Sequence, residues 1–245
     1  MALILNIDTA LQQATICISN NNIVIAEQGN SNQYNHASFL QPAIKWIFEK
    51  TAIKLSSIDA IAVVNGPGSY TGLRVGLASA KGLCYALHKP LILINTLELM
   101  AFASANNGKW KMESGKLQLH NEQTLNLKPE TPNPLHCPMI DARRMEVFTA
   151  LYNDKLEEIT PPSAEIIDKN FLNEKLEKST IIFSGNGSSK FQHVCNSANA
   201  IFSNNNYSAA HISFLSSKAF AENKFADPAY CEPFYIKAFY TAKPL

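Results

Sequence analysis

The sequence predicts an α/β fold in which helices cover a partly parallel sheet. Over residues 2–104, short β-prone apolar runs alternate with longer segments whose apolar residues recur at helical spacing. Residues 58–64 are apolar throughout and end at Asn65-Gly66, which is typical of a strand buried on both faces. The 245-residue chain is 46% hydrophobic, which is enough for the cores of one or two domains.

The first elements are predicted to form a three-stranded antiparallel meander. Residues 2–8, 14–19 and 23–28 are β-prone, and the run Asn20-Asn21-Asn22 separates the last two. Because asparagine tolerates positive φ, this run predicts a hairpin turn. No basic segment precedes the first apolar run, so we expect a strand there and not a signal peptide.

A helix is expected from about residue 36. Leu40, Ile44 and Ile47 recur at helical spacing, and Asn35 is a suitable N-terminal cap. Pro42 falls within this pattern, so the helix either begins near Pro42 or bends there.

The longest predicted helix covers residues 70–87 and carries two stripes. One stripe is apolar and contains Leu73, Leu77, Ala80, Cys84 and Leu87. The other consists of small residues and includes Gly72 and Gly76, each of which should cost about 1 kcal/mol relative to alanine within a helix. Two glycines one turn apart predict that another backbone approaches this helix closely.

Less regular elements are expected afterwards. A strand at residues 91–94 and a helix at 96–104 are followed by residues 106–137, whose polar, proline-containing sequence predicts a flexible insertion or linker. A strand, a turn and a strand are expected over residues 138–152. A further strand is predicted at 180–183, and a final helix at about 212–226.

Charge and cysteine usage exclude several classes of protein. With 21 basic and 20 acidic residues the net charge is +1, which argues against strong RNA or DNA binding by this chain alone. The five widely spaced cysteines form no CxxC motif, so buried free thiols in a reducing cytosol are expected. Lys89, Pro90 and Glu98 interrupt the longest later apolar stretch, so a cytoplasmic protein without a membrane span is expected.

The glycine-rich segment NGPGSYTGLRVG, residues 65–76, departs from the known phosphate-binding templates. A P-loop requires GxxxxGK[ST], but five residues separate Gly66 from Gly72 and Leu73-Arg74 follows. In the dinucleotide fingerprint the third glycine comes one residue earlier. A helix start capped by Ser69 is the preferred interpretation, and an anion held by the free N–H groups of the first turn is the alternative.

Asp8-Thr9, at the end of the first predicted strand, is another candidate for phosphate contact. Actin-like ATPases have roughly D-x-G-x-[ST] at this position. Here Ala10 replaces the glycine and Gln12 replaces the hydroxyl residue, which argues against phosphate binding.

Several segments together resemble one known family. They are ILNIDTA, His36 before a helix, VVNGPGSYTGLRVGLASAKGL, MIDARRMEVF and SGNGSS. In these segments the chain resembles the bacterial tRNA threonylcarbamoyladenosine biosynthesis family TsaB, also called YeaZ. The resemblance covers residues 2–104 and, less closely, residues 138–190.

The resemblance implies an actin/sugar kinase/Hsp70-like (ASKHA, ribonuclease H-like) fold with two α/β lobes. The first lobe would comprise residues 1–104 together with the helix at about 212–226. The second, smaller lobe would comprise residues 105–211 and include the polar insertion 106–137.

The resemblance also implies an accessory subunit without a transferase site of its own. It would bind and activate the catalytic paralogue TsaD, which transfers a threonylcarbamoyl group to the adenosine next to the anticodon of tRNA. A TsaE-like ATPase would join the complex, and the chain alone would form a homodimer. We expect no tightly bound cofactor, since ATP and Mg²⁺ are used by the complex. We also expect the chain to contact tRNA only within the complex.

The histidines can be checked against this role. The catalytic paralogue holds its metal with a His-x-x-x-His pair, but Leu40 lies four residues after His36, and the six histidines include no such pair. We therefore expect no metal site and no catalytic residue. The alternatives are a stand-alone ASKHA-type ATPase or kinase and, less favoured, a peptidase of the glycoprotease-like class.

In the family, two helices of the first lobe form the surface that binds TsaD or a second TsaB copy. The matching residues expected at the partner interface are Leu40, Ile44, Ile47, Gly72, Leu73, Arg74, Gly76, Leu77 and Ala80. For each apolar residue the alternative is packing under its own sheet, and for Arg74 it is simple solvation. The interface interpretation predicts that Gly76→Leu leaves the fold intact and abolishes partner binding.

Two further motifs have expected roles. For Asp141, Arg143 and Arg144, on the predicted turn, a structural ion pair or a contact between lobes is preferred over a partner or nucleotide contact. Candidates for residual phosphate or nucleotide contacts are Asp8, Thr9, Ser69, Gly185, Asn186 and Gly187.

Overall fold

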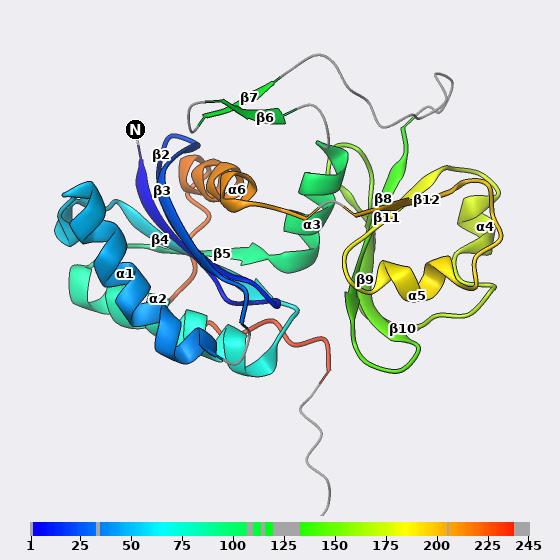
Figure 1. Ribbon diagram of the computed structural model, residues 1–245, viewed down its shortest axis with the longest axis horizontal. Coiled ribbons are helices and arrows are strands. Elements are labelled where there is room, and N and C mark those ends of the chain that lie inside the picture. The colour runs from blue at the N-terminus through cyan, green and yellow to red at the C-terminus, as the bar shows by residue number, and fades with distance from the viewer. Residues whose placement is uncertain are drawn as a thin grey trace, which may run out of the picture.

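Two five-stranded sheets with matching topology form the two lobes of the computed structural model (Figure 1). The model describes residues 2–32, 35–106, 110–113, 116–119, 133–204 and 206–237. The first sheet has the order β3-β2-β1-β4-β5 and the second has the order β10-β9-β8-β11-β12. In each, three antiparallel strands are followed by two parallel ones. The α/β prediction is confirmed, and the sequence shows no repeat that signals this duplication.

The strands of the first sheet lie close to their predicted positions. They are β1 (Leu3–Asp8), β2 (Ala14–Asn20), β3 (Ile23–Asn30), β4 (Ala60–Gly66) and β5 (Leu91–Asn95). Asn21 and Asn22 have positive φ, so the predicted asparagine turn between β2 and β3 is confirmed. Successive side chains of β1 point to opposite faces of the sheet, which gives this lobe two apolar layers.

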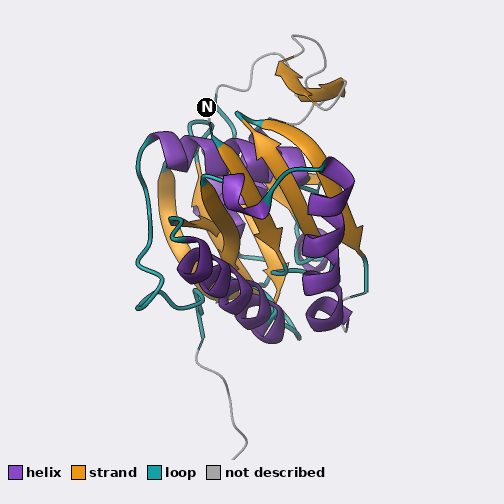
Figure 2. Cartoon of the chain, turned by 90° about the vertical axis from the view of Figure 1, so that its left-hand side faces the viewer, coloured by secondary structure: helices purple, strands orange, loops and turns teal. Residues whose placement is uncertain are grey.

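Helices cover both faces of the first sheet (Figure 2). α1 (His36–Thr51) and α2 (Tyr70–Leu87) pack on the layer that contains Leu5 and Ile7. α6 (Ala209–Ala221) packs on the opposite layer, which contains Ile4. α3 (Thr96–Ala105) contacts β8 and β9 and so lies between the two sheets.

The ends of these helices test the predicted caps. α2 has the predicted bounds, and the Gly72 N–H donates to Ser69 Oγ at 3.4 Å, so the cap is confirmed. α1 begins at His36 with Pro42 inside it, and the predicted Asn35 cap is wrong because its side chain makes no capping bond. α6 begins at Ala209, earlier than predicted, because Ser208 and His211 form a reciprocal cap.

The second lobe contains more regular structure than the sequence predicted. Its strands are β8 (Leu135–Asp141), β9 (Glu146–Tyr152), β10 (Glu158–Ile166), β11 (Ile181–Ser184) and β12 (Ala200–Ser203). The short helices α4 (Asn173–Leu176) and α5 (Ser188–Gln192) accompany them. Phe183 and Phe191 are fully buried and centre the core. β10 was missed because it contains Pro161 and Pro162, which a strand tolerates at the edge position that β10 occupies.

The predicted insertion at residues 106–137 is shorter than expected. β8 begins at Leu135, so the last residues of that stretch belong to the sheet. The strands β6 (Trp110–Glu113) and β7 (Lys116–Leu119) form a hairpin within the stretch. Most of the remaining insertion lies outside the described residues.

After α6, the chain returns along the first lobe as the C-terminal segment, residues 222–237. Ala226 forms a bridge with Leu91, and the Phe234 N–H donates to the Asn65 carbonyl oxygen at 2.8 Å. Lys237 then forms an ion pair with Glu146 of the second lobe. The segment therefore contacts both lobes.

All five cysteines are free, as predicted, and Cys17, Cys84 and Cys137 are buried. Burial raises the pKa of the Cys84 and Cys137 thiols to about 12. None of the helices in the described ranges combines the length and the apolar character that crossing a bilayer requires.

Candidate functional site

A cavity of about 320 Å³ lies between the two lobes. The first lobe contributes Asp8, Gln12 and Gln13 from the connection between β1 and β2. The second lobe contributes Gly185 and Asn186 from the turn between β11 and α5, and Tyr207 comes from the segment before α6. Its lining is mixed polar and apolar, so the cavity can accept a small polar molecule.

Asp8, at the carboxyl end of β1, is the one carboxylate among the described residues that line this cavity. Burial raises the pKa of Asp8 to about 6, while hydrogen bonds with the Ala10 N–H and Tyr207 oppose that rise. The Ala10 N–H donates to Asp8 Oδ1 at 2.9 Å. Burial and the nearby Asp8 charge also raise the pKa of Tyr207. Each of the two side chains therefore supplies a hydrogen-bond partner for the other at the cavity wall.

The glycine-rich segment after β4 packs against the β1–β2 connection. The Ser69 N–H donates to the Ala10 carbonyl oxygen at 2.7 Å, and Thr9 Oγ1 donates to the Gly72 carbonyl oxygen at 2.7 Å. A Cβ atom on Gly68 would lie 2.2 Å from the Ala10 carbonyl oxygen, and one on Gly72 would lie 2.0 Å from the Thr9 carbonyl oxygen. The predicted close backbone approach is confirmed, and the approaching backbone belongs to this chain.

Other backbone donors around the cavity also have partners within the chain. The Gly187 N–H donates to the Met139 carbonyl oxygen at 2.9 Å. The Asp141 N–H donates to Asn186 Oδ1 at 3.0 Å. Phosphate cradles depend on free N–H groups that point at the ligand. The N–H groups of Ala10, Ser69 and Gly187 are therefore engaged in holding the two lobes' loops in place.

The structure brings together some of the predicted phosphate candidates and separates others. Asp8, Gly185 and Asn186 line the cavity, whereas Thr9 and Ser69 are used in the contact with α2. Gly187 packs against the backbone of residues 140–141. Sequence reasoning missed Tyr207, which stands in a loop without any motif, and it considered Gln12 only as a departure from the phosphate template. Among the described residues, no group of three or more His, Cys, Asp or Glu side chains is placed to hold a metal ion.

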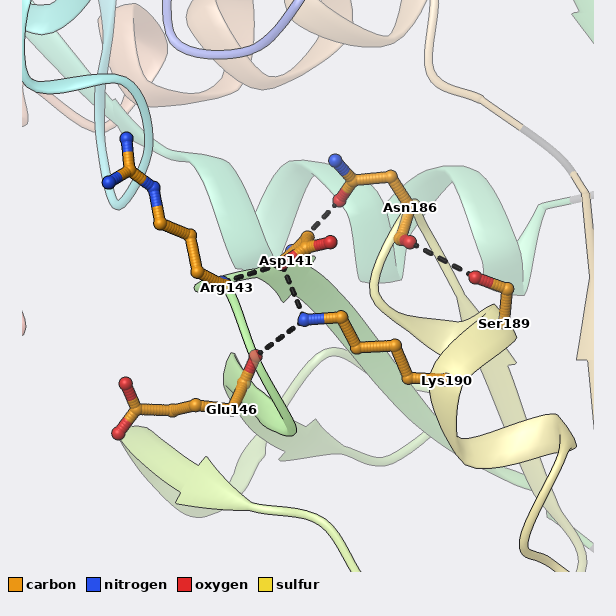
Figure 3. A network of polar contacts seen from close by, with 6 residues as sticks. All are labelled: Asp141, Arg143, Glu146, Asn186, Ser189 and Lys190. Carbon is orange, nitrogen blue, oxygen red and sulfur yellow. Dashed lines mark hydrogen bonds and ion pairs between the residues drawn. The ribbon is translucent and has the colours of Figure 1, made fainter.

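A polar network joins the β8–β9 connection to α5 in the second lobe (Figure 3). Lys190 Nζ lies 2.5 Å from Asp141 Oδ1 and also donates to the Glu146 carbonyl oxygen. Partial burial would raise the pKa of Asp141, but the Lys190 bond and the Arg143 N–H outweigh it and hold this pKa below its usual value. The predicted structural ion pair therefore exists, with Lys190 as the cation in place of Arg143 or Arg144.

Most of the residues predicted at the partner interface are buried within the chain itself. Leu40, Ile47 and Ala80 are fully buried, and Ile44, Leu73 and Leu77 are at most 5% exposed. Most of these side chains join the apolar layer between the first sheet and the two helices, and Leu73 packs in the opposite layer. Gly72 and Gly76 are also buried, and a Cβ on Gly76 would lie 2.4 Å from Thr9 Oγ1. The alternative interpretation, packing under the chain's own sheet, holds for all of these except Arg74, which is exposed.

The opposite side of α2 is exposed, and we call it the outer face of α2. It consists of Tyr70, Thr71, Arg74, Ala78, Gly82 and Tyr85. Tyr85 is 84% exposed. Arg74 Nη1 donates to the Tyr70 hydroxyl at 2.8 Å, and the Tyr70 ring stacks on Tyr235 of the C-terminal segment with 5.1 Å between centroids. On α1, the exposed Gln41 is bonded to Ser79 of α2 at 3.0 Å, so the two helices present adjoining surfaces.

Comparison with known proteins shows which proteins the chain resembles. Residues 24–112 match the family described as "TsaD: tRNA N6-adenosine threonylcarbamoyltransferase". The chain is 30% identical over 161 residues to the "tRNA threonylcarbamoyladenosine biosynthesis protein TsaB" of Bacillus subtilis, covering 64% of this chain and 59% of that protein. It is 30% identical over 149 residues to the protein of the same name from Escherichia coli, covering 61% of this chain and 54% of that protein. The chain is therefore similar to proteins named TsaB (YeaZ).

The solved structure titled "YeaZ from Pseudomonas aeruginosa" superposes with a TM-score of 0.71 at 18% identity, covering 96% of this chain and all of that one. The chain therefore shares the two-lobed fold of that structure. The matched region spans between one half and three fifths of the length of the TsaB relatives above.

Proposed function

We propose that this chain is a non-catalytic accessory subunit in the formation of threonylcarbamoyladenosine in tRNA. It binds and activates a TsaD-type catalytic paralogue. The TsaB names of its relatives support the pathway, and the match of its first lobe to the TsaD family supports a paralogous pair that share a fold.

The observation that carries the non-catalytic role is the internal use of the phosphate-binding positions. Asp8 is bonded to the Ala10 N–H and to Tyr207, and the Ser69 and Gly187 N–H groups are bonded to carbonyl oxygens. A nucleotide would have to displace these bonds at the positions where an ASKHA enzyme holds phosphate. These contacts support a role in which the residues around the cavity stabilise the arrangement of the two lobes. In this proposal ATP and Mg²⁺ are used by the complex.

The outer face of α2 is the surface that we assign to the partner. Tyrosine and arginine are enriched among the residues that dominate binding energy at interfaces, and this face offers Tyr70, Arg74 and Tyr85. Ala78 and Gly82 lie between Arg74 and Tyr85 and allow another helix to approach closely. In the absence of the catalytic subunit, the same face forms a homodimer. A TsaE-type ATPase and tRNA join through the complex, in the cytoplasm.

A reconstituted modification assay tests this function. Purified TsaD-type and TsaE-type proteins, threonylcarbamoyl-adenylate synthase, ATP, threonine, bicarbonate and tRNA are combined with and without this chain. Modified adenosine is quantified by mass spectrometry of nucleosides. We expect modification only when the chain is present. An equal yield without it would show that the chain is no part of this activity.

A further inference from the structure

The tip of the connection between β8 and β9 holds two arginines in an unfavourable backbone conformation. Arg143 has φ 71° and Arg144 has φ 49°. Side chains larger than glycine avoid this region because Cβ crowds the following carbonyl oxygen, and Asn-Gly is preferred where two successive residues adopt it. The Arg143 N–H donates to Asp141 Oδ1 at 2.6 Å, and the Glu146 N–H donates to the Arg143 carbonyl oxygen at 3.1 Å. These bonds hold the tip in place against its local preference.

The charges of the two arginines are not neutralised by their neighbours. Asp141 is paired with Lys190, and Glu146 is paired with Lys237. Within the ranges that the structure describes, neither guanidinium group forms an ion pair or a hydrogen bond, and both arginines are exposed. Figure 3 shows the Arg143 side chain extending away from Asp141 and Lys190. The tip therefore presents two free positive charges on a chain whose net charge is only +1.

A groove of about 650 Å³ lies beside this tip. Arg143, Arg144 and Lys237 line it together with Glu146, Met145 and Ile166. Lys237 comes from the C-terminal segment, whereas the other described residues of the lining belong to the second lobe. A guanidinium group presents its donors in a planar fork that matches the oxygens of a phosphate. Among the residues that the structure describes, those that line the groove include no aromatic ring.

We propose that Arg143 and Arg144 bind phosphate groups of the tRNA backbone when the chain acts within its complex. This inference rests on the proposed function, which brings tRNA to the complex. Two contacts supply too little affinity for this chain to bind RNA alone, in agreement with its near-neutral charge. Added to the contacts of a catalytic subunit, they retain and orient the substrate. The backbone conformation is kept because it displays two adjacent guanidinium groups.

The test compares tRNA binding by the assembled complex with wild-type and variant chains. Fluorescently labelled tRNA is titrated by anisotropy over a series of salt concentrations. With the double substitution Arg143→Gln and Arg144→Gln, we expect roughly tenfold weaker binding and a salt slope smaller by about 2, because two phosphate contacts are lost. The control is Lys155→Gln with Lys169→Gln, which removes the same charge from exposed positions of the second lobe outside the groove. It should leave binding unchanged.

A second variant separates charge from folding. Arg143→Asn with Arg144→Gly supplies the residues that this turn prefers. It should raise the melting temperature of the chain and weaken tRNA binding as much as the glutamine variant does. Equal tRNA affinity for the control and either arginine variant would overturn the proposal.

Two other outcomes are distinguishable. If the arginine variants weaken assembly of the complex but the assembled complex binds tRNA normally, the groove contacts an acidic protein surface and the RNA assignment is wrong. If the wild-type chain neither joins the complex nor supports modification, the proposed function fails and this inference falls with it. Assembly and modification with the wild-type chain are measured first, so this failure is recognised before any variant is compared.

Discussion

The two faces of α2 use the same kinds of residue for different purposes. On the inner face, Gly76 faces Thr9, and a Cβ there would lie 2.4 Å from Thr9 Oγ1. On the outer face, Gly82 has no atom within 4 Å of the corresponding position. A glycine on this helix therefore marks close packing on one side and open surface on the other. Spacing in the sequence identifies the stripes of a helix, and the neighbouring elements decide which stripe is buried.

The largest effect is expected at Gly76. Gly76→Leu places four heavy atoms against Thr9, Val63 and Ile7, which are all fully buried. We expect the free energy of unfolding to fall by about 3 kcal/mol, the upper range for an overpacked core. Urea denaturation measures the loss. The sequence alone predicted that Gly76→Leu leaves the fold intact. The structure instead predicts that it destabilises the fold.

The matched control for Gly76→Leu is Gly82→Ala on the same helix. It should raise the free energy of unfolding by about 0.5 to 1 kcal/mol, because alanine is the better helix former and nothing obstructs its methyl group. If both substitutions had similar effects on stability, the contrast between the two faces would be lost.

The next largest effect depends on pH and concerns Asp8, beside Thr9 under the inner face. Because burial raises the pKa of Asp8 to about 6, the folded chain holds a proton there that the unfolded chain releases near pH 4. The free energy of unfolding should therefore lose roughly 2 to 3 kcal/mol from this group as the pH rises from about 4 to about 6. Above that range the contribution stays constant.

Asp8→Asn isolates this contribution, since both chains share every other titrating group. Urea denaturation between about pH 4 and pH 7 should show the variant gaining stability relative to the wild type as the pH rises. A difference that stays constant with pH would mean that Asp8 has an ordinary pKa and is accessible to solvent, as a cation-binding carboxylate would be.

Local patterns were sufficient for the first lobe. The alternation of β-prone and helical segments placed β1 to β5, and the stripes placed α2 with its Ser69 cap. The sequence did not predict β10, because its two prolines are incompatible with a central strand. Only the sheet order shows that β10 is an edge strand. The start of β8 was not predicted, because the proline-containing stretch before it has no periodicity.

The candidate site was predicted less completely, because its residues meet only through tertiary structure. Asp8 and Asn186 stood at the ends of predicted strands, and both line the cavity. Tyr207 carries no local signal, and its bond with Asp8 depends on how the chain returns into α6. The apolar residues assigned to the partner have the predicted helical periodicity, but they pack under the chain's own sheet. Periodicity could not show this, since a helix between a sheet and solvent has one apolar stripe whichever surface a partner uses.

The central claim is that the outer face of α2 binds the catalytic subunit. The most direct test is the affinity of the chain for the TsaD-type protein, measured by calorimetry for the wild type and for Arg74→Glu with Tyr85→Ala. We expect at least tenfold weaker binding with little change in melting temperature, because both side chains are exposed and such residues dominate interfaces. Wild-type affinity in this variant would contradict the claim and place the partner on another surface.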